Sequence, residues 1–299
     1  MQAISNITQA REEAVFLVNA KGEGLFGVWH EPGDETSRRN IAIVMLHGWS
    51  GTRTGPHQML TRAARAFAAD GYRVLRFDFA GRGDSDGDTE AATLATMADD
   101  VRDALQWCEE EKQVSQVVLV GLCSGCEVAL AAATRNAGVC ALALWSAPVF
   151  AAGESSERKS RKRLHYAKEY ARKLLRPSTY AKVFAGRLDT KSIGKALSGG
   201  GGAENKNVEA NIAGQLPPGW RSAALKRFEK WTAPLLLVYG TGDPTTDEAL
   251  AWYRAQVQGR IEPQVHFVEG ANHSYYGLAW EHDVFAITLD WLGRLTTTQ

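Results

Sequence analysis

The sequence predicts an α/β fold with a doubly wound, mostly parallel sheet and an inserted helical lid. Short apolar runs rich in Val, Ile and Leu alternate with segments of helical periodicity along most of the chain. Several of these runs end in glycine-rich turns, which are typical of the ends of strands. The alternation stops after about residue 150 and resumes near residue 234, which indicates an insertion between two strands of the sheet.

The first half of the chain supplies strands and helices in close succession. We expect an antiparallel hairpin, buried strands and amphipathic helices, in the order 14–32 (hairpin), 41–51 (strand and turn), from about 56 (helix), 72–87 (strand and loop), 97–110 (helix), 117–133 (strand, turn and helix) and 139–148 (strand). Apolar residues at helical spacing support the first helix, namely Met59, Leu60, Ala63, Ala64 and Phe67.

The second half completes the sheet after the insertion. A strand and loop over 234–244, a helix over 246–256, a strand over 264–270 and a final helix over 280–295 succeed one another. We therefore predict one core formed by residues 1–149 and 226–299, interrupted by a basic helical cap at 150–225.

The composition excludes several classes of protein. Acidic and basic residues are equal in number, 34 of each, and 44% of residues are hydrophobic, which favours neither a nucleic-acid-binding nor a disordered chain. No run is apolar and long enough to span a bilayer, so we expect a cytoplasmic protein. Four cysteines in a chain of this length do not indicate a disulfide framework.

The strongest local signal is the sequence GLCSG, which lies between an apolar run and an alanine-rich helical segment. Gly121 and Gly125 flank Cys123 at minus two and plus two, the spacing of a nucleophile elbow. Glycine is needed there because the turn is tight and side chains at these positions would collide. Ser124 is the alternative nucleophile, but its corresponding neighbours are a leucine and a cysteine. The spacing selects Cys123, whose thiolate the start of a helix favours.

A thiol nucleophile needs a base, and the base needs an orienting acid. Of the seven histidines, His273 lies in a loop just past the last predicted strand, where it can reach the strand ends. Asp243 comes after the preceding strand at the same edge of the sheet, with Asp247 as the reserve candidate and the better fit to a helix cap. His47 belongs to a histidine–glycine turn, which favours a structural role or a place beside the substrate pocket.

Two backbone N–H groups are candidates for an oxyanion hole. Ser124 comes directly after the nucleophile at the helix start, and Trp49 lies in the HGWSG turn after an earlier strand. The indole of Trp49 either forms a wall of the acyl pocket or packs in the core.

The predicted cap is strongly basic and contains an amphipathic helical pattern. One interpretation is a solvated lid surface; the other is that basic side chains attract a carboxylate, a phosphate, coenzyme A or an acidic lipid surface. The candidate lid residues are Arg161, Arg163, Tyr166 and Tyr170.

The order Cys123–Asp243–His273, with HG after one strand and GRGDS after the next, resembles the α/β-hydrolase superfamily from about residue 41 to the C-terminus. The GLC elbow and the basic segment are also similar to hydrolases found beside bacterial exosortase (PEP-CTERM) systems. This resemblance implies a bacterial cytoplasmic enzyme. Cysteine as nucleophile is a departure from most of the superfamily, shared with dienelactone hydrolases.

We therefore expect hydrolysis of a small-molecule carboxylic ester or thioester, of anionic type under the second interpretation of the cap, without a metal or cofactor. An acyltransferase that uses the same acyl-cysteine is one alternative, and a non-catalytic binding protein on the same fold is another. The pair Cys123 and Cys126 also matches a redox dithiol motif, but a thioredoxin-like protein would leave Asp243, His273 and the HGWSG turn unexplained.

Overall fold

The structure is a computed structural model that describes residues 10–33, 38–150 and 216–296. Its contacts divide the chain into one unit of Met1–Phe150 with Pro217–Gln299 and a second unit of Ala151–Leu216. Apart from Leu216, the second unit lies outside the described residues, as does most of the cap predicted at 150–225, so the predicted domain boundaries stay a prediction. Every helix and strand that the structure describes belongs to the first unit.

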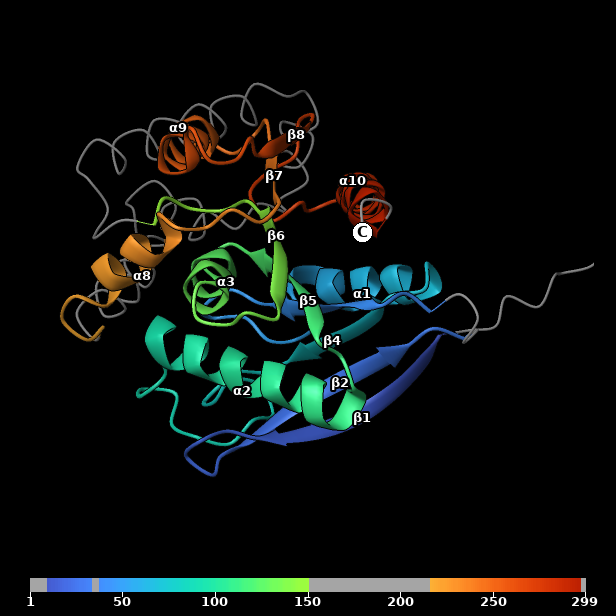
Figure 1. The fold of residues 1–299 in the computed structure, drawn as a ribbon. Coiled ribbons are helices and arrows are strands. Elements are labelled where there is room, and N and C mark those ends of the chain that lie inside the picture. Colours follow the sequence, from blue (N-terminus) through green and yellow to red (C-terminus); the bar gives the residue numbers. More distant parts are fainter. Residues whose placement is uncertain (1–9, 34–37, 151–215, 297–299) are drawn as a thin grey trace, which may run out of the picture. The chain divides into compact units, whose positions relative to one another are not determined.

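Eight strands form one sheet in the order β1-β2-β4-β3-β5-β6-β7-β8 (Figure 1). The strands are β1 (Arg11–Val18), β2 (Gly24–Glu31), β3 (Ile41–Leu46), β4 (Arg73–Phe77), β5 (Gln116–Leu122), β6 (Val139–Trp145), β7 (Leu235–Gly240) and β8 (Gln264–Val268). β2 pairs antiparallel with β1 and β4, and the remaining pairs are parallel. The predicted α/β class with a doubly wound, mostly parallel sheet is confirmed, and the hairpin and every predicted strand occur in the described residues; the predicted helical lid lies outside them.

Helices cover both faces of this sheet (Figure 1). They are α1 (Met59–Ala69), which comes after a short 3-10 turn at Pro56–Gln58, α2 (Leu94–Lys112), α3 (Gly125–Ala133), α8 (Trp220–Phe228), α9 (Thr246–Val257) and α10 (Leu278–Thr296). α1 and α10 pack on one face, while α2, α3 and α8 pack together on the other. The sequence did not predict α8, which begins inside the region assigned to the cap.

The central strands β3 and β7 are buried from end to end and β5 is buried from its second residue on, because both faces of a parallel sheet are covered. Alternate residues of β3, β5 and β6 join α1 and α10 in one apolar cluster. The residues predicted for the inner face of the first helix are all buried, which confirms its orientation: Met59, Leu60, Ala63, Ala64 and Phe67. This packing fixes the carboxyl ends of the parallel strands, where the candidate residues lie.

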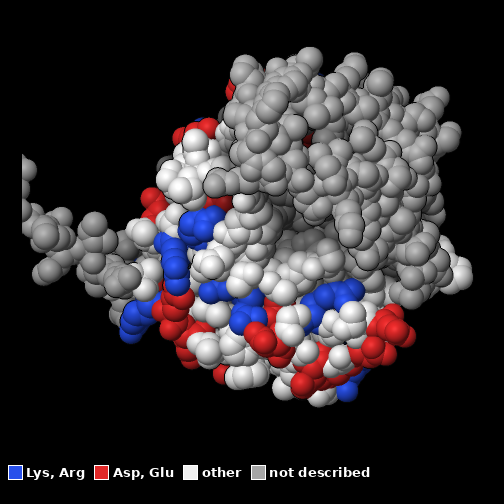
Figure 2. Space-filling model, turned by 180° about the vertical axis from the view of Figure 1, so that it is seen from behind, with Lys and Arg blue, Asp and Glu red and all other residues white. Residues whose placement is uncertain are grey.

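The described surface carries mixed charge. Figure 2 shows Lys and Arg side chains interleaved with Asp and Glu over the described part of one face. Within the described ranges, no helix combines the length and apolar character that crossing a membrane requires.

Candidate active site

The turn between β5 and α3 has the geometry of a nucleophile elbow. Cys123 has φ +56°, a left-handed conformation that costs a non-glycine residue free energy. A Cβ on Gly121 would lie 2.7 Å from the backbone of Cys126, and one on Gly125 would lie 2.3 Å from the carbonyl oxygen of Leu46. Gly121 is therefore required because a side chain would collide with the other side of the turn, whereas Gly125 allows α3 to pass close to the end of β3.

Ser124 has a different role from Cys123 in this turn. It precedes the first residue of α3 with ordinary helical angles, φ −63° and ψ −17°, and carries none of the strain of its neighbour. Its Oγ accepts the backbone N–H of Trp49 at 2.7 Å, which directs the hydroxyl toward the turn after β3. The strained position at the tip of the elbow belongs to Cys123 alone.

The loops after β7 and β8 are joined by backbone contacts that bring an acid and a histidine together. The N–H of Gly242 donates to the carbonyl of Ala271 at 2.9 Å, and a Cβ on Gly240 would lie 2.2 Å from that same oxygen. As a result Asp243 Oδ2 lies 2.6 Å from His273 Nδ1. The carboxylate is 3% exposed and the imidazole 38% exposed, so the acid is buried behind a base that reaches the surface.

Asp243 is held on its other side as well. Its Oδ1 accepts the backbone N–H of Thr245 at 3.0 Å and the hydroxyl of the same residue at 2.8 Å. Both oxygens of the carboxylate are therefore fixed, one toward the helix start and one toward His273. Asp247, the reserve candidate, is exposed in the first turn of α9.

The imidazole of His273 also forms a hydrogen bond with the Cys123 side chain, and Nε2 is the atom left for it because Nδ1 contacts Asp243. Burial raises the pKa of Cys123, but the charge and hydrogen bond of His273 and the N–H of Ser124 outweigh it, so this pKa is lowered. Burial lowers the pKa of His273, yet Cys123 and Asp243 together raise it to about 10. The arrangement favours a thiolate beside an imidazolium.

The two predicted oxyanion donors lie beside this pair. A Cβ on Gly48 would lie 3.4 Å from Ser124 Oγ and 3.6 Å from the Cβ of Cys123, so the HGWSG turn passes directly over the elbow. In this state both N–H groups have acceptors: the amide of Ser124 donates to Cys123, and the amide of Trp49 donates to the Ser124 hydroxyl. A substrate oxyanion would have to replace these acceptors.

Arg82 holds the Trp49 turn in place, a role that sequence reasoning missed. Its Nε donates to the carbonyl oxygen of Trp49 at 2.8 Å, and its guanidinium lies 4.5 Å from the centre of the indole ring. Burial lowers the pKa of this arginine. The half-buried indole of Trp49 thus packs against the guanidinium of Arg82. Arg82 belongs to the GRGDS sequence, which was the one sequence feature that could have indicated this role.

Glu127 and Arg221 form a second contact that the sequence did not indicate. Glu127, in the first turn of α3, forms an ion pair with Arg221 of α8. The guanidinium of Arg221 also lies 5.2 Å from the ring of Phe150, which packs on Trp220. Phe150 and the start of α8 therefore both lie near α3.

His47 is buried, and its Nδ1 lies 2.8 Å from the carbonyl oxygen of Gly48. Burial lowers its pKa to about 4, so the ring is neutral near pH 7.

Cys126 is buried too; its thiol donates to the carbonyl of Gly121 at 3.1 Å, and burial raises its pKa well above the ordinary value.

The candidate lid residues Arg161, Arg163, Tyr166 and Tyr170 lie outside the described residues. Among the residues that the structure does describe, no group of three or more His, Cys, Asp or Glu side chains could hold a metal ion.

The chain matches the alpha/beta hydrolase family over residues 43–286 and belongs to it. This membership agrees with the single, mostly parallel sheet of the described residues. Over 78 residues the chain is 28% identical to the uncharacterized 31.7 kDa protein in the traX-finO intergenic region of Escherichia coli. That match spans only 26% of the length of this curated relative and 26% of the present chain.

Solved structures with the same fold cover nearly the whole chain. The esterase Pf2001 of Pyrococcus furiosus has a TM-score of 0.64 at 16% identity, over 99% of this chain and 95% of its own. The hydrolase GrgF of a Penicillium species gives 0.65 at 18% identity, over 96% and 99%. Dienelactone hydrolase of Anabaena variabilis gives 0.60 at 14% identity, over 96% and 98%. At these identities the likeness shows the fold alone.

Proposed function

We propose that the protein is a cysteine-dependent hydrolase of small-molecule carboxylic esters or thioesters. The single observation that best supports this is the hydrogen-bonded series from Asp243 through His273 to Cys123, with the cysteine at the strained tip of the elbow. The lowered pKa of Cys123 contrasts with the raised pKa values of Cys108, Cys126 and Cys140, so one thiol of four is prepared for attack.

In the proposed reaction the Cys123 thiolate attacks the carbonyl carbon, and the carbonyl oxygen becomes an oxyanion facing the amides of Trp49 and Ser124. As the tetrahedral intermediate collapses, the bond to the leaving group breaks and the imidazolium of His273 gives it a proton. His273 then takes a proton from water, whose oxygen attacks the acyl-cysteine. The acid is released, the thiolate re-forms and the imidazole keeps the proton. Asp243 holds Nδ1 and stabilises the charged ring throughout.

Selective alkylation tests the nucleophile without any knowledge of the substrate. At pH 7 iodoacetamide should modify Cys123 first, because the pKa of Cys108 is raised to about 12 and that of Cys140 to about 11 by burial. Peptide mapping of wild type, Cys123→Ala and the control Cys140→Ala locates the label. Labelling of another cysteine at a rate equal to that of Cys123 contradicts the proposed activation.

An acyl adduct tests the chemistry. Incubation with p-nitrophenyl and thioester substrates and then intact mass measurement should give one acyl group per chain, lost in Cys123→Ala and kept in Cys140→Ala. Adding a second thiol or alcohol as acceptor distinguishes hydrolysis from acyl transfer, the alternative that uses the same intermediate. An adduct on Ser124, or ligand binding that survives Cys123→Ala with no turnover of any substrate, contradicts the mechanism.

Several finer predictions stay open beside this proposal. The anionic character of the substrate and the resemblance to exosortase-associated hydrolases depend on the basic segment, which lies outside the described residues. The bacterial origin and the cytoplasmic location also stay predictions; four free thiols in the structure are consistent with a reducing compartment.

A further inference from the structure

A cavity of about 340 Å³ lies at the opposite end of α3 from Cys123. Thr134, Arg135 and Asn136 line it just past the last turn of that helix, and Arg227, Lys230 and Trp231 line it from the end of α8. α3 rises about 1.5 Å per residue over its nine residues, so roughly 13 Å of helix separates this cavity from the elbow. The site is distinct from the proposed catalytic centre.

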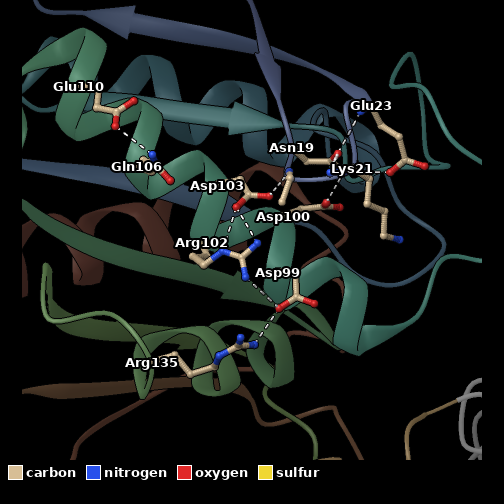
Figure 3. A network of polar contacts seen from close by, with 11 residues as sticks. Asn19, Lys21, Glu23, Asp99, Asp100, Arg102, Asp103, Gln106, Glu110 and Arg135 are labelled. Carbon is tan, nitrogen blue, oxygen red and sulfur yellow. Dashed lines mark hydrogen bonds and ion pairs between the residues drawn. The ribbon is translucent and has the colours of Figure 1, made fainter.

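Three of the lining residues are cations and none of the described lining residues is an acid. Arg135 forms an ion pair with Asp99 of α2 at 2.8 Å, and Figure 3 shows it turned toward this carboxylate, which Arg102 shares. Arg227 and Lys230 have no ion pair with any residue that the structure describes. Burial and the charge of Arg135 lower the pKa of Arg227, so the cavity holds positive charge that the fold does not compensate.

Two buried N–H donors at this cavity also lack acceptors. The Nε of Arg227 and the indole Nε1 of Trp231 are inaccessible and have no hydrogen-bond partner in the described part of the chain. Trp231 is 8% exposed. A buried donor without an acceptor costs about 1–3 kcal/mol, and a bound ion or water is one explanation for such a group.

Capping of the helix ends is the simpler explanation for these cations, since a helix C-terminus attracts positive charge. Other donors already serve these carbonyl groups. Thr134 and Asn136 donate to the carbonyls of Ala131 and Ala132 at 3.1 and 2.8 Å. Arg260 donates to the carbonyls of Phe228 and Trp231 at 3.0 and 2.8 Å. The charges of Arg227 and Lys230 are left for another anion.

We propose that this cavity binds the phosphoryl group of a small molecule, held by Arg227 and Lys230. A phosphoryl group has the several acceptor oxygens and the double negative charge that a guanidinium and an ammonium together satisfy. The cavity is larger than inorganic phosphate requires, so it also has room for an attached organic group. This site does not depend on the proposed activity at Cys123.

Calorimetric titration tests the proposal, with inorganic phosphate, pyrophosphate and a sugar phosphate as probes at constant ionic strength. The wild type should bind at least one probe saturably, and Arg227→Gln with Lys230→Gln should weaken it by about tenfold or more. Lys226→Gln is the matched control, because it removes an exposed charge on the same helix outside the cavity. Tighter binding of the sugar phosphate than of phosphate identifies an organic ligand as the source of the phosphoryl group.

Thermal unfolding without the probe verifies that each variant folds, and Cys123→Ala should bind as the wild type does. Absence of saturable binding overturns the proposal. So does equal binding by wild type and the Arg227→Gln, Lys230→Gln double variant, which places the anion elsewhere, for example on the basic segment.

Discussion

Replacing Ser124 with alanine separates the two candidate nucleophiles and tests the oxyanion hole in one experiment. The hydroxyl of Ser124 accepts the N–H of Trp49 at 2.7 Å, and the same N–H is a proposed donor to the substrate oxyanion. A substrate has to displace this hydroxyl before the amide can serve. The Ser124→Ala variant removes the competing acceptor and leaves the backbone N–H of residue 124 in place.

The size of the effect depends on the hydrogen bond that is lost. A neutral hydrogen bond of this kind contributes about 1 kcal/mol net. Its loss should therefore lower the free energy of unfolding by about 1 kcal/mol. Because the transition state no longer has to break it, acylation of Cys123 should become faster by about fivefold, the rate equivalent of 1 kcal/mol.

Stopped-flow measurement of the p-nitrophenol burst gives the acylation rate, and urea unfolding gives the stability. Ser222→Ala is the matched control, since Ser222 is exposed on α8, away from the elbow. Peptide mapping of the trapped adduct should find the acyl group on Cys123 in the wild type and in both variants.

Two results would refute this reasoning. A loss of acylation of about a hundredfold or more in Ser124→Ala means that the hydroxyl takes part in the chemistry. An unchanged acylation rate together with the expected loss of stability means that the Trp49 amide does not serve the oxyanion.

Three further changes test the elbow and its charges. The acylation rate of the wild type should rise as the pH passes the lowered pKa of Cys123 and fall near pH 10, where His273 loses its proton. The reason is that the attacking form is the Cys123 thiolate beside the His273 imidazolium. A rate that keeps rising beyond pH 10 contradicts this ion pair. Glu127→Gln removes a carboxylate that raises the pKa of Cys123, so the reaction of Cys123 with iodoacetamide should begin at a lower pH. The protein should also lose stability, because the ion pair with Arg221 is broken. An unchanged pH profile of alkylation means that the carboxylate is screened from Cys123. Gly125→Ala places a Cβ 2.3 Å from a backbone carbonyl oxygen of β3 and should lower the free energy of unfolding in urea by about 3 kcal/mol or more. The control is Gly293→Ala in α10, where an added Cβ has no heavy atom within 4 Å and should stabilise the protein slightly. Equal effects of the two substitutions contradict the steric explanation.

The elbow could be predicted from sequence because its constraint is local. The left-handed backbone of Cys123 and the close contacts of Gly121 and Gly125 concern residues that are near neighbours in the chain or at the adjoining strand end. The two glycines and their spacing around Cys123 therefore indicate the turn directly in the sequence. The alternating apolar runs predicted the sheet for the same reason, since burial on both faces leaves a continuous hydrophobic signal.

The supporting contacts of Arg82 with Trp49 and of Glu127 with Arg221 could not be predicted, because they join distant residues of common types. Arg221 and Glu127 are 94 positions apart, and no spacing rule relates them. α8 was missed because only Ala224 and Phe228 of its nine residues are buried, which leaves almost no periodic pattern. The contact of Arg82 with the Trp49 carbonyl likewise depends on the fold that brings two strand ends together.

These distant charges matter more for a cysteine elbow than they would for a serine. A serine hydroxyl is neutral before the reaction, so a nearby carboxylate changes its ground state little. Cys123 is held close to ionisation by opposing influences: burial and Glu127 raise its pKa, whereas His273 and the Ser124 N–H lower it. Arg221 forms an ion pair with Glu127 and so limits the charge that opposes the thiolate. The position of α8 therefore influences the ionisation of Cys123, the proposed nucleophile, although no residue of α8 need contact a substrate.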